Sequence, residues 1–365
     1  MNTVLQPTTT AELQEMVTAS KRLSVRGGGS KPGLSAPAAG AISVEMRRLT
    51  GMIEYVPDEF VCTAYAGTPV SQVADELARH GQYLPFDPLL AGRGATLGGT
   101  VAANTCGSGR YRGGGVRDFI LGVRFVDGRG QLVRSGGQVV KNAAGFDLAK
   151  FFVGSLGRYG ILVEISFKVF PRPRSYLTLE FTYPSLAEVQ QAVFRLALEP
   201  LDIDALDFQP AGKSEFRLLV RLGGLEAGLP DRAARLEEFL LVEGRPLPQQ
   251  TLLGDRETAY WRDVNQLAWV PSEAWLLKVP LGPRSVAMLD ARLRSALRRY
   301  TAGGSVAWLA VDDLQAARIV LTDLGLTGLR IWGSGGDPFV GPRRGMVLAQ
   351  RAKQALDPAG RFGGA

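Results

Sequence analysis

Residues 94–104 read GATLGGTVAAN, and this stretch carries the clearest signal of the fold. It lies inside a longer tract, residues 91–115, that is rich in Gly, Ala, Thr and Ser. Small side chains add little to an ordinary core, but they let a backbone press against a flat ligand. Close packing of a helix on a sheet would use the same composition. The tract therefore predicts either a cofactor-binding backbone or a tightly packed structural element.

A glycine-rich loop precedes this tract. Residues 26–33 read RGGGSKPG and follow a predicted strand at residues 23–25. Successive glycines let backbone N–H groups reach phosphate oxygens, and Ser30 and Lys31 add a hydroxyl and a positive charge. A turn between two strands is an equally good interpretation of the loop alone. It is neither a dinucleotide fingerprint nor a P-loop, because Pro32 follows it and no Walker lysine pattern occurs.

Length and composition indicate a globular protein of about two domains. The chain has 365 residues, of which 45% are hydrophobic and 21% charged. The N-terminal segment lacks a signal peptide pattern and no apolar run is long enough for a membrane span, so we expect an intracellular, cytoplasmic protein. Cys62 and Cys106 are the two cysteines, which we interpret as free thiols.

The net charge of +7 leaves room for an acidic partner, a membrane surface or an anionic cofactor. The densest basic cluster is Arg292, Arg294, Arg298 and Arg299, in a segment with helical character. No aromatic residues are interleaved with it, so we expect a solvated helix face and no nucleic-acid binding.

The hydrophobic pattern divides the chain at about residue 175. Before it we expect a helix capped by Thr9, a helix capped by Thr68, and strands at residues 42–45, 52–56, 60–65, 120–126, 131–134 and 161–170. From 175 to 325, strands near Leu177, Ala205, Phe216, Trp275 and Val306 alternate with amphipathic helices near Leu186, Ala233, Ser285 and Leu314. This pattern predicts an α+β domain with helices on a sheet face. Residues 343–355 form one more predicted helix.

Histidine is nearly absent. His80 is the single histidine of the sequence and stands beside Gly81, where a helix C-cap role is expected. One histidine excludes a Ser-His-Asp triad and a His-rich metal site, and we predict no metal. No catalytic residue can be assigned: Arg110, Arg112, Arg117 and Lys278 could bind a carboxylate but are poor bases.

Five segments, in order and spacing, resemble the FAD-binding domain of the vanillyl-alcohol oxidase type, also called PCMH-type. They are the glycine loop, residues 94–104, GGVRDFILGVRFVDGRG (114–130), VVKNAAGFDL (139–148) and GSLGRYGILVEISFKVFPRP (154–173). Within that family, LPFDPLLAGRGATLGGTVAAN (84–104) and KNAAGFDL (141–148) resemble an FAD-binding subunit of the glycolate oxidases. Residues 356–362 resemble the family's closing segment, which returns to the FAD domain.

The resemblance implies three parts: an FAD-binding domain of two subdomains at residues 1–174, an α+β cap at 175–325, and a C-terminal segment at 326–365 that packs back on the FAD domain. It places the FAD pyrophosphate on the glycine loop, and the flavin ring and adenine beside the backbone of the later segments. We expect Gly29 and Gly98 to lie where backbone meets cofactor. The implied cofactor-binding residues are Arg26, Gly27, Gly28, Gly29, Ser30, Lys31, Pro88, Ala95, Thr96, Leu97, Gly98, Gly99, Ala102, Gly107, Ser108, Gly109, Gly160, Ile161 and Val163.

Three positions depart from the family pattern. Ser30 stands where many members carry a histidine bonded to the flavin, so FAD is expected to bind non-covalently. Phe146 replaces a common tyrosine, and Gly363, Gly364 and Ala365 replace the usual Asn-Pro-Gly ending.

By resemblance, the chain is an FAD-dependent oxidoreductase acting on the CH–OH group of glycolate or related short 2-hydroxy acids. It would work with a second flavoprotein and an iron–sulfur subunit, and the complex could associate peripherally with a membrane. Two alternatives stay open: a self-sufficient alcohol or alditol oxidoreductase, and a non-catalytic basic interaction protein on the same fold. The sequence leaves open the exact substrate, the terminal electron acceptor, the stoichiometry of the complex, and whether this flavin is catalytic or relays electrons.

Overall fold

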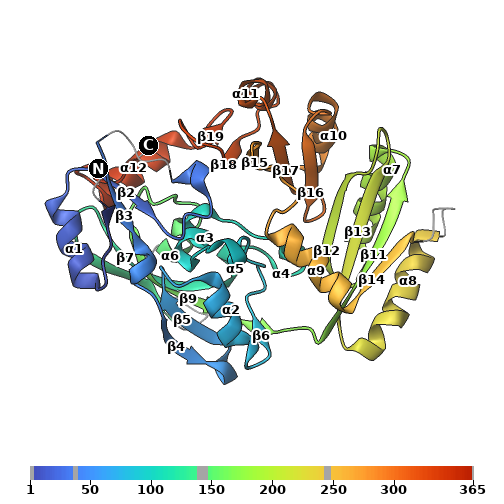
Figure 1. Cartoon of the computed structure of the whole chain (residues 1–365), viewed down its shortest axis with the longest axis horizontal. Coiled ribbons are helices and arrows are strands. Elements are labelled where there is room, and N and C mark those ends of the chain that lie inside the picture. Colours follow the sequence, from blue (N-terminus) through green and yellow to red (C-terminus); the bar gives the residue numbers. More distant parts are fainter. Residues whose placement is uncertain (1–3, 36–39, 138–146, 242–247, 364–365) are drawn as a thin grey trace.

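A computed structural model describes residues 4–35, 40–137, 147–241 and 248–363 (Figure 1). The chain forms two lobes, which we call the FAD lobe and the cap. The FAD lobe contains the N-terminal part of the chain and the final helix, so both termini lie on it. The cap contains the second large sheet and its helices.

Two sheets build the FAD lobe. The smaller is parallel, in the order β1 (Val4–Leu5), β3 (Ile42–Glu45) and β2 (Leu23–Arg26). The larger is antiparallel, in the order β4 (Met52–Val56), β5 (Val61–Tyr65), β9 (Ile161–Lys168), β7 (Ile120–Val126) and β8 (Leu132–Gly136). A short ribbon pairs β6 (Gln82–Tyr83) with β10 (Phe170–Pro171). The helices of this lobe are α1 (Thr10–Ala19), α2 (Val70–Ala78), α3 (Leu97–Ala103), α4 (Arg110–Gly113), α5 (Val116–Phe119), α6 (Leu148–Phe152) and α12 (Met346–Leu356), with a 3-10 turn η1 (Pro32–Leu34) after the glycine loop.

Local sequence signals account for α1 but only partly for α2. The Thr9 hydroxyl caps α1 by accepting the Glu12 N–H at 3.2 Å, and Leu13 and Val17 are buried, as predicted. The expected Thr68 cap of α2 is wrong: Pro69 is the N-cap residue. The Thr68 hydroxyl instead accepts the Gly51 N–H at 2.9 Å and donates to the Gly51 carbonyl at 3.1 Å. The Thr68 side chain therefore binds the backbone of Gly51 and does not cap α2.

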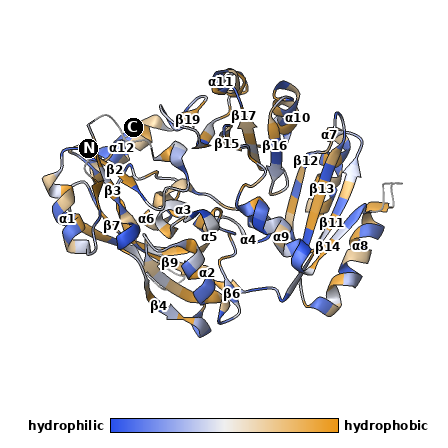
Figure 2. Cartoon of the chain, in the orientation of Figure 1, coloured by the Kyte–Doolittle hydropathy of each residue, from blue (hydrophilic) through white to orange (hydrophobic). Residues whose placement is uncertain are grey.

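The cap is built on one antiparallel sheet whose strands differ in length. Its order is β14 (Gln250–Leu253), β11 (Ser175–Tyr183), β13 (Phe216–Gly224), β12 (Ile203–Pro210), β16 (Leu297–Thr301), β17 (Val306–Val311), β15 (Trp275–Pro280), β18 (Gly328–Trp332) and β19 (Phe339–Val340). Its helices are α7 (Leu186–Leu198), α8 (Leu229–Leu241), α9 (Gly254–Asn265), α10 (Pro283–Arg292) and α11 (Leu314–Asp323). Figure 2 shows β12 and β13 mainly hydrophobic and α9 mainly hydrophilic. The α+β prediction for this region is confirmed.

The hydrophobic core explains how the lobes are joined. One hydrophobic cluster lies between the cap sheet and the helices α7, α8, α10 and α11. A second cluster combines FAD-lobe residues such as Leu97 and Val101 with Leu276, Trp308 and Ile331 from the cap sheet. The β15, β17 and β18 part of the cap sheet therefore shares a continuous apolar core with the FAD lobe.

Two of the four arginines expected on a solvated helix face lie elsewhere. The helix α10 ends at Arg292, and Arg298 and Arg299 lie on β16. Arg298 pairs with Asp290 at 2.6 Å, and Arg299 is 4% exposed and pairs with the buried Asp207 at 3.2 Å. The expectation is wrong for these two arginines, because both lie on a strand and pair with buried carboxylates.

The C-terminal segment returns to the FAD lobe. Leu23 N–H donates to the Arg361 carbonyl at 2.7 Å, and Leu23 forms a parallel bridge with Phe362. The expected boundary at residue 326 precedes β18 and β19, which both pair within the cap sheet. The returning segment thus starts after Val340. Among the described residues, no helix is long and apolar enough to cross a membrane.

Candidate functional site

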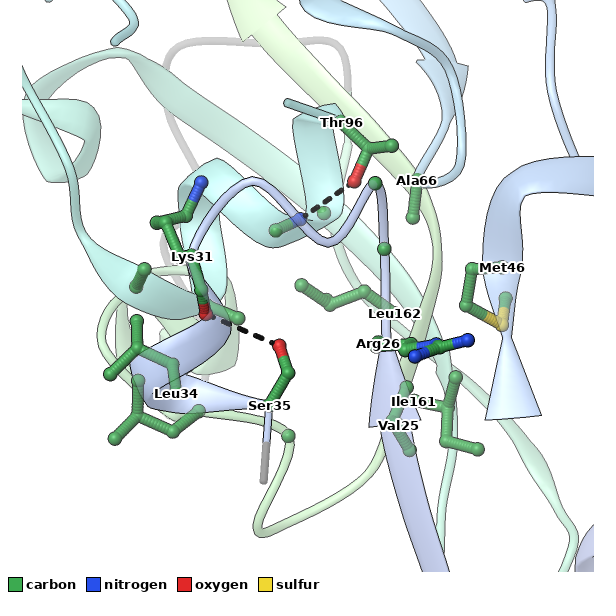
Figure 3. A pocket seen from close by; sticks show the side chains of 18 of the residues that line it. Val25, Arg26, Lys31, Leu34, Ser35, Met46, Ala66, Thr96, Ile161 and Leu162 are labelled. Carbon is green, nitrogen blue, oxygen red and sulfur yellow. Dashed lines mark hydrogen bonds between the residues drawn. The ribbon is translucent and has the colours of Figure 1, made fainter. Parts of the chain in front are cut away.

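A groove opens between the glycine loop and α3 (Figure 3). Including its mouth and the open solvent there, it holds about 740 Å³ of empty space. Figure 3 shows Lys31, Leu34 and Ser35 on one side and Arg26, Met46 and Ile161 on the other. The groove is lined by Val25, Arg26, Gly27, Gly28, Gly29, Ser30, Lys31, Leu34, Ser35, Met46, Ala66, Thr96, Gly98, Gly99, Ala102, Ala103, Ser155, Leu156, Gly157, Gly160, Ile161 and Leu162.

The glycines of the loop bring two segments into direct backbone contact. A Cβ on Gly27 would lie 2.1 Å from the Thr96 hydroxyl, and one on Gly28 would lie 1.6 Å from the Gly94 carbonyl oxygen. Gly29 has φ +73°, a conformation that favours glycine. The two glycine-rich segments singled out in the sequence therefore pack against each other and form adjoining walls of the groove.

The two glycines of α3, Gly98 and Gly99, have different surroundings. A Cβ on Gly98 would lie 2.8 Å from the Ala66 Cβ and 2.9 Å from the Ala66 carbonyl oxygen, so Gly98 is needed for packing against the segment after β5. A Cβ on Gly99 would meet one atom within 4 Å, the Thr96 hydroxyl at 3.1 Å, and Gly99 is half-buried at the groove. Both glycines line the groove, so contact of Gly98 and of Gly99 with the cofactor stays a prediction.

Lys31 places a buried positive charge in the groove. Its side chain is 6% exposed, and its ammonium donates to the Ser30 hydroxyl at 3.2 Å. It makes no ion pair with the residues that the structure describes. Burial lowers the pKa of Lys31 to about 8, because a desolvated ammonium without a counter-ion is disfavoured. An anion bound in the groove would supply the missing counter-charge.

The other cations near the loop have partners within the protein. The Arg26 guanidinium pairs with Glu45, which also accepts a hydrogen bond from the Gln6 amide at 2.7 Å. Arg47 donates to the Gly28 carbonyl oxygen. Arg26 and Arg47 thus hold the loop to the parallel sheet, while Lys31 is the loop cation without a carboxylate partner in the described chain.

A third wall comes from residues 154–160. The Ser155 hydroxyl is buried in this wall and has no hydrogen-bond partner among the described residues. The wall is fixed from outside: Lys353 of α12 donates to the Arg158 carbonyl oxygen at 2.7 Å and pairs with Asp357 at 2.7 Å. A buried hydroxyl without a partner is costly unless a ligand completes it.

The cap braces the loop from behind. The Trp332 indole N–H of β18 donates to the Ser30 carbonyl oxygen at 3.1 Å, and Arg93 stacks over the indole at 4.6 Å. A Cβ on Gly33 would lie 2.6 Å from the Arg330 carbonyl oxygen. Strand β18 and η1 therefore meet backbone to backbone, which makes the loop geometry depend on the cap.

The sequence-predicted site residues divide into two groups. The groove brings together Arg26, Gly27, Gly28, Gly29, Ser30, Lys31, Thr96, Gly98, Gly99, Ala102, Gly160 and Ile161. It does not include Pro88, Ala95, Leu97, Gly107, Ser108, Gly109 or Val163. Ala95, Leu97 and Val163 are fully buried in the core, and the Ser108 hydroxyl donates to Asp207 at 2.5 Å. For both groups, cofactor contact stays a prediction.

Several lining residues were not among the predicted ones. Ser155, Leu156 and Gly157 belong to a segment quoted for the resemblance, and their small or turn-forming character was the available signal. Val25, Leu34, Met46 and Ala66 look like ordinary core residues in sequence, so no local pattern marks them. Most of the KNAAGFDL segment, including Phe146, and the terminal residues Gly364 and Ala365 lie outside the described residues.

The four proposed carboxylate binders do not line the groove. Arg112 pairs with Asp204 at 3.2 Å and Arg117 is exposed. Lys278 is buried and donates to the Asn104 carbonyl oxygen, and burial lowers its pKa to about 8. Arg110 lies close enough to Lys278 to depress that pKa further. His80 packs edge-on against Tyr55 at 5.2 Å.

The groove fits FAD by its own chemistry. A dinucleotide diphosphate needs exposed backbone N–H groups, a counter-cation and little steric obstruction. The glycine loop, buried Lys31 and unpaired Ser155 hydroxyl offer these features together. The apolar walls, with Leu34, Met46 and Leu162, suit flat rings.

Comparisons with known proteins agree with this geometry. Residues 1–136 match the family described as "FAD binding domain". The chain is 34% identical to glycolate oxidase subunit GlcE of Escherichia coli K12, and the match covers 96% of this chain and 94% of that protein. It is 28% identical to glycolate oxidase subunit GlcD of Bacillus subtilis over 70% of this chain, but it spans about half of that protein, 53%.

A solved structure shares the fold. An alkyldihydroxyacetonephosphate synthase superposes with a TM-score of 0.74 at 15% identity, covering 98% of this chain and 76% of the synthase. At this identity the likeness concerns the fold alone. The predicted PCMH-type FAD-binding fold with an α+β cap is confirmed.

Proposed function

Because the chain belongs to the GlcE family of glycolate oxidase subunits, we propose that it is the FAD-binding subunit of a complex that oxidises glycolate or a related 2-hydroxy acid to the 2-oxo acid. The match over nearly the whole length of E. coli GlcE carries this proposal. The buried, unpaired Lys31 in a glycine-walled groove supports the cofactor part.

We propose that FAD binds non-covalently. When bound, FAD would supply the redox chemistry, as acceptor of a hydride from the substrate carbon or of electrons from another redox centre. The glycine loop presents its backbone to the diphosphate, and the Lys31 ammonium neutralises it. Ser30 offers a hydroxyl, which forms no covalent bond to flavin under ordinary conditions, and the Ser155 hydroxyl donates to the ligand.

Partner subunits complete this proposal. Cys62 and Cys106 are both buried, and burial raises the pKa of each thiol, to about 12 for Cys62. Two cysteines cannot hold a four-cysteine iron–sulfur cluster, so electrons that leave the flavin for a cluster pass to another chain. A second flavoprotein and an iron–sulfur subunit would supply the remaining centres, and we place the complex in the cytoplasm.

The experiment is a turnover assay of the FAD-loaded chain with glycolate and an artificial dye acceptor, alone and with the co-expressed partner subunits. We expect low turnover alone and high turnover in the complex. The matched control is a complex carrying Gly99→Val, which should assemble without flavin in this subunit. Full turnover by the isolated chain would favour a self-sufficient alcohol oxidoreductase. A colourless chain that takes up no FAD would favour an interaction protein.

A further inference from the structure

A surface groove lies beside residues 171–174, the segment that leads from the FAD lobe into the cap. Including its mouth and the open solvent there, it holds about 1180 Å³ of empty space. The FAD lobe contributes α4, α5 and the β6–β10 ribbon to its lining, and the cap contributes the ends of β12 and β13. It shares no lining residue with the groove beside the glycine loop. We call it the linker groove.

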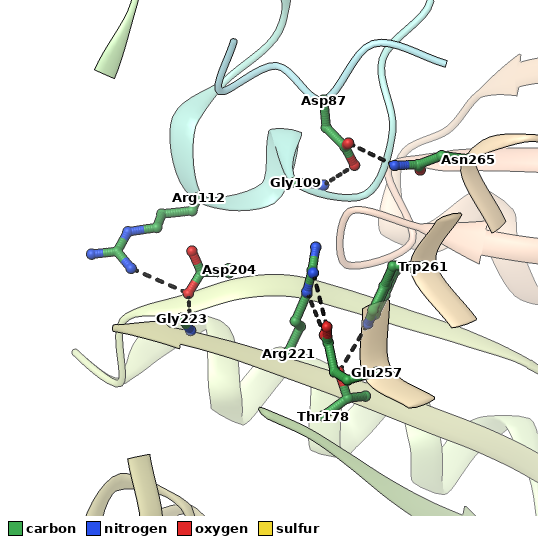
Figure 4. Close-up of polar contacts among 10 residues, drawn as sticks. All are labelled: Asp87, Gly109, Arg112, Thr178, Asp204, Arg221, Gly223, Glu257, Trp261 and Asn265. Carbon is green, nitrogen blue, oxygen red and sulfur yellow. Dashed lines mark hydrogen bonds and ion pairs between the residues drawn. The ribbon is translucent and has the colours of Figure 1, made fainter. Parts of the chain in front are cut away.

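The linker groove carries more positive than negative charge. Three arginines and one aspartate line it. Arg112 pairs with Asp204 at 3.2 Å, and Asp204 also accepts the Gly223 N–H at 2.5 Å (Figure 4). Arg172 and Arg174 are exposed, and their guanidinium groups make no hydrogen bond or ion pair with the part of the chain that the structure describes. Two cations of the groove therefore lack a carboxylate partner within the described chain.

Exposed apolar side chains line the same groove. Phe170 is 37% exposed and packs edge-on against Phe119, with 5.7 Å between the ring centres. Leu225, which follows β13 on the cap, is 67% exposed. Aromatic and arginine side chains are enriched in protein–protein interfaces, where they supply much of the binding energy. The linker groove thus combines apolar contact area with free positive charge.

Acidic residues beside the groove limit the kind of anion that fits. The side chain of Asp202, which pairs with Arg112 at 3.3 Å, is 72% exposed. Glu226 follows Leu225 on an exposed turn. A nucleic acid or an anionic membrane surface spreads its negative charge over a wide area and would meet these carboxylates. A short acidic segment of a protein can instead place its carboxylates at the two free arginines alone.

We propose that the linker groove docks an acidic segment of a partner subunit. Carboxylates of that segment pair with Arg172 and Arg174, and an apolar side chain packs beside Phe170 and Leu225. Charge complementarity is the reason for this occupant, because the free cations of the groove need counter-charges from outside the described chain. The inference rests on the proposed function for the existence of partner subunits, and it adds the surface that they contact and the chemistry of the contact.

The experiment measures how tightly the FAD-loaded chain binds the co-expressed partner subunits, at low and at high salt. The main variant combines Arg172→Glu with Arg174→Glu. It should raise the dissociation constant about tenfold or more at low salt and by less at high salt, because two attractive charges become repulsive. The control combines Arg235→Glu with Arg284→Glu, which make the same change of charge on exposed positions of α8 and α10 outside the groove. The control should bind nearly as the wild type does.

A second variant, Leu225→Ser, tests the apolar contact and covers a folding failure of the first. Leu225 is mostly exposed, so its replacement should leave the fold intact. It should weaken assembly about threefold to tenfold, because less apolar surface is buried, and should leave the salt dependence as in the wild type. Unchanged FAD affinity will show that each variant is folded.

The outcomes separate this inference from the proposed function. Wild-type assembly by both groove variants would overturn the docking site and leave the function as an FAD-binding subunit in place. A wild-type chain that joins no partner subunit would overturn both. If the double variant assembled normally and lost only its binding to phosphatidylserine vesicles, the groove would contact a membrane and the docking proposal would be wrong.

Discussion

The Trp332 indole N–H donates a hydrogen bond of 3.1 Å to the carbonyl oxygen of Ser30. This contact joins the cap sheet to the glycine loop, and Trp332 belongs to the apolar cluster that both lobes share. The peptide unit that Trp332 holds is the one that leads into Lys31. The cap therefore contributes to the geometry of a groove that lies in the other lobe.

Replacement of Trp332 by Phe should weaken FAD binding without unfolding the chain. Phe retains most of the buried apolar surface but loses the N–H donor, which typically contributes about 1 kcal/mol. We expect FAD to bind about fivefold to tenfold more weakly, measured by fluorescence titration. Trp269→Phe is the control, because the buried Trp269 N–H has no partner among the described residues. Equal FAD affinity in the two variants would show that the Trp332 hydrogen bond does not support the glycine loop.

Gly99→Val and Gly98→Val should separate cofactor binding from folding. The valine side chain introduced by Gly99→Val would enter the groove and meet little protein, so FAD binding should be lost while the FAD-free chain keeps its thermal stability. Gly98→Val would press a side chain on Ala66 and should destabilise the fold by about 1–3 kcal/mol or more. The measurements are denaturant unfolding and FAD titration. A soluble, stable Gly98→Val chain that has lost only FAD would contradict this division.

Lys31→Met should change stability and FAD affinity in opposite directions. In the FAD-free protein the pKa of Lys31 is about 8, below its ordinary value of 10.5. The charged form is thus disfavoured by folding, at a cost of up to about 3 kcal/mol below pH 8 that disappears as pH rises toward 10.5. Lys31→Met should therefore stabilise the FAD-free chain at neutral pH but not near pH 10.5.

The same substitution should weaken FAD binding at neutral pH by about tenfold to a hundredfold, because the phosphate loses its counter-charge. Wild-type affinity should fall as pH rises above 8, when the ammonium loses its proton, and this dependence should be smaller in Lys31→Met. Other groups that titrate are present in both chains, so the difference between them reports on Lys31. If FAD affinity changed with pH in the same way in the wild type and in Lys31→Met, Lys31 would not face an anion.

Arg299→Leu should be strongly destabilising. It would leave Asp207, which is fully buried, without its ion pair, although the Ser108 hydroxyl and Ala302 N–H would remain. The expected loss is about 3–5 kcal/mol in the free energy of unfolding, measured by denaturant titration. Arg294→Leu, on the loop between α10 and β16, should change stability by less than about 0.5 kcal/mol. If the two variants were equally stable, the ion pair of Arg299 with Asp207 would not stabilise the fold.

Sequence alone could predict the elements that rest on local chemistry. The Thr9 cap, the strands β7 and β8, and the two glycine segments all follow from residue types at short spacing. The domain class followed from the alternation of strands and helices after residue 175. These features need no knowledge of distant partners.

The features that sequence could not predict depend on contacts between distant residues. Arg299 is buried because Asp207, on a neighbouring strand, neutralises it. Trp332 braces a loop 302 residues earlier in the chain. Glu257 can be buried, at 1% exposure, because Arg221 on β13 neutralises it. Charge, burial and orientation at these positions are set by tertiary pairing, which leaves no periodic signal.

The most direct test of the account is titration of the FAD-free chain with FAD, followed by acid precipitation. The account predicts that one FAD binds per chain, that Gly99→Val removes this binding, and that acid releases all the flavin into the supernatant because Ser30 forms no covalent link. A chain that takes up no FAD, or flavin that stays with the precipitated protein, would contradict it.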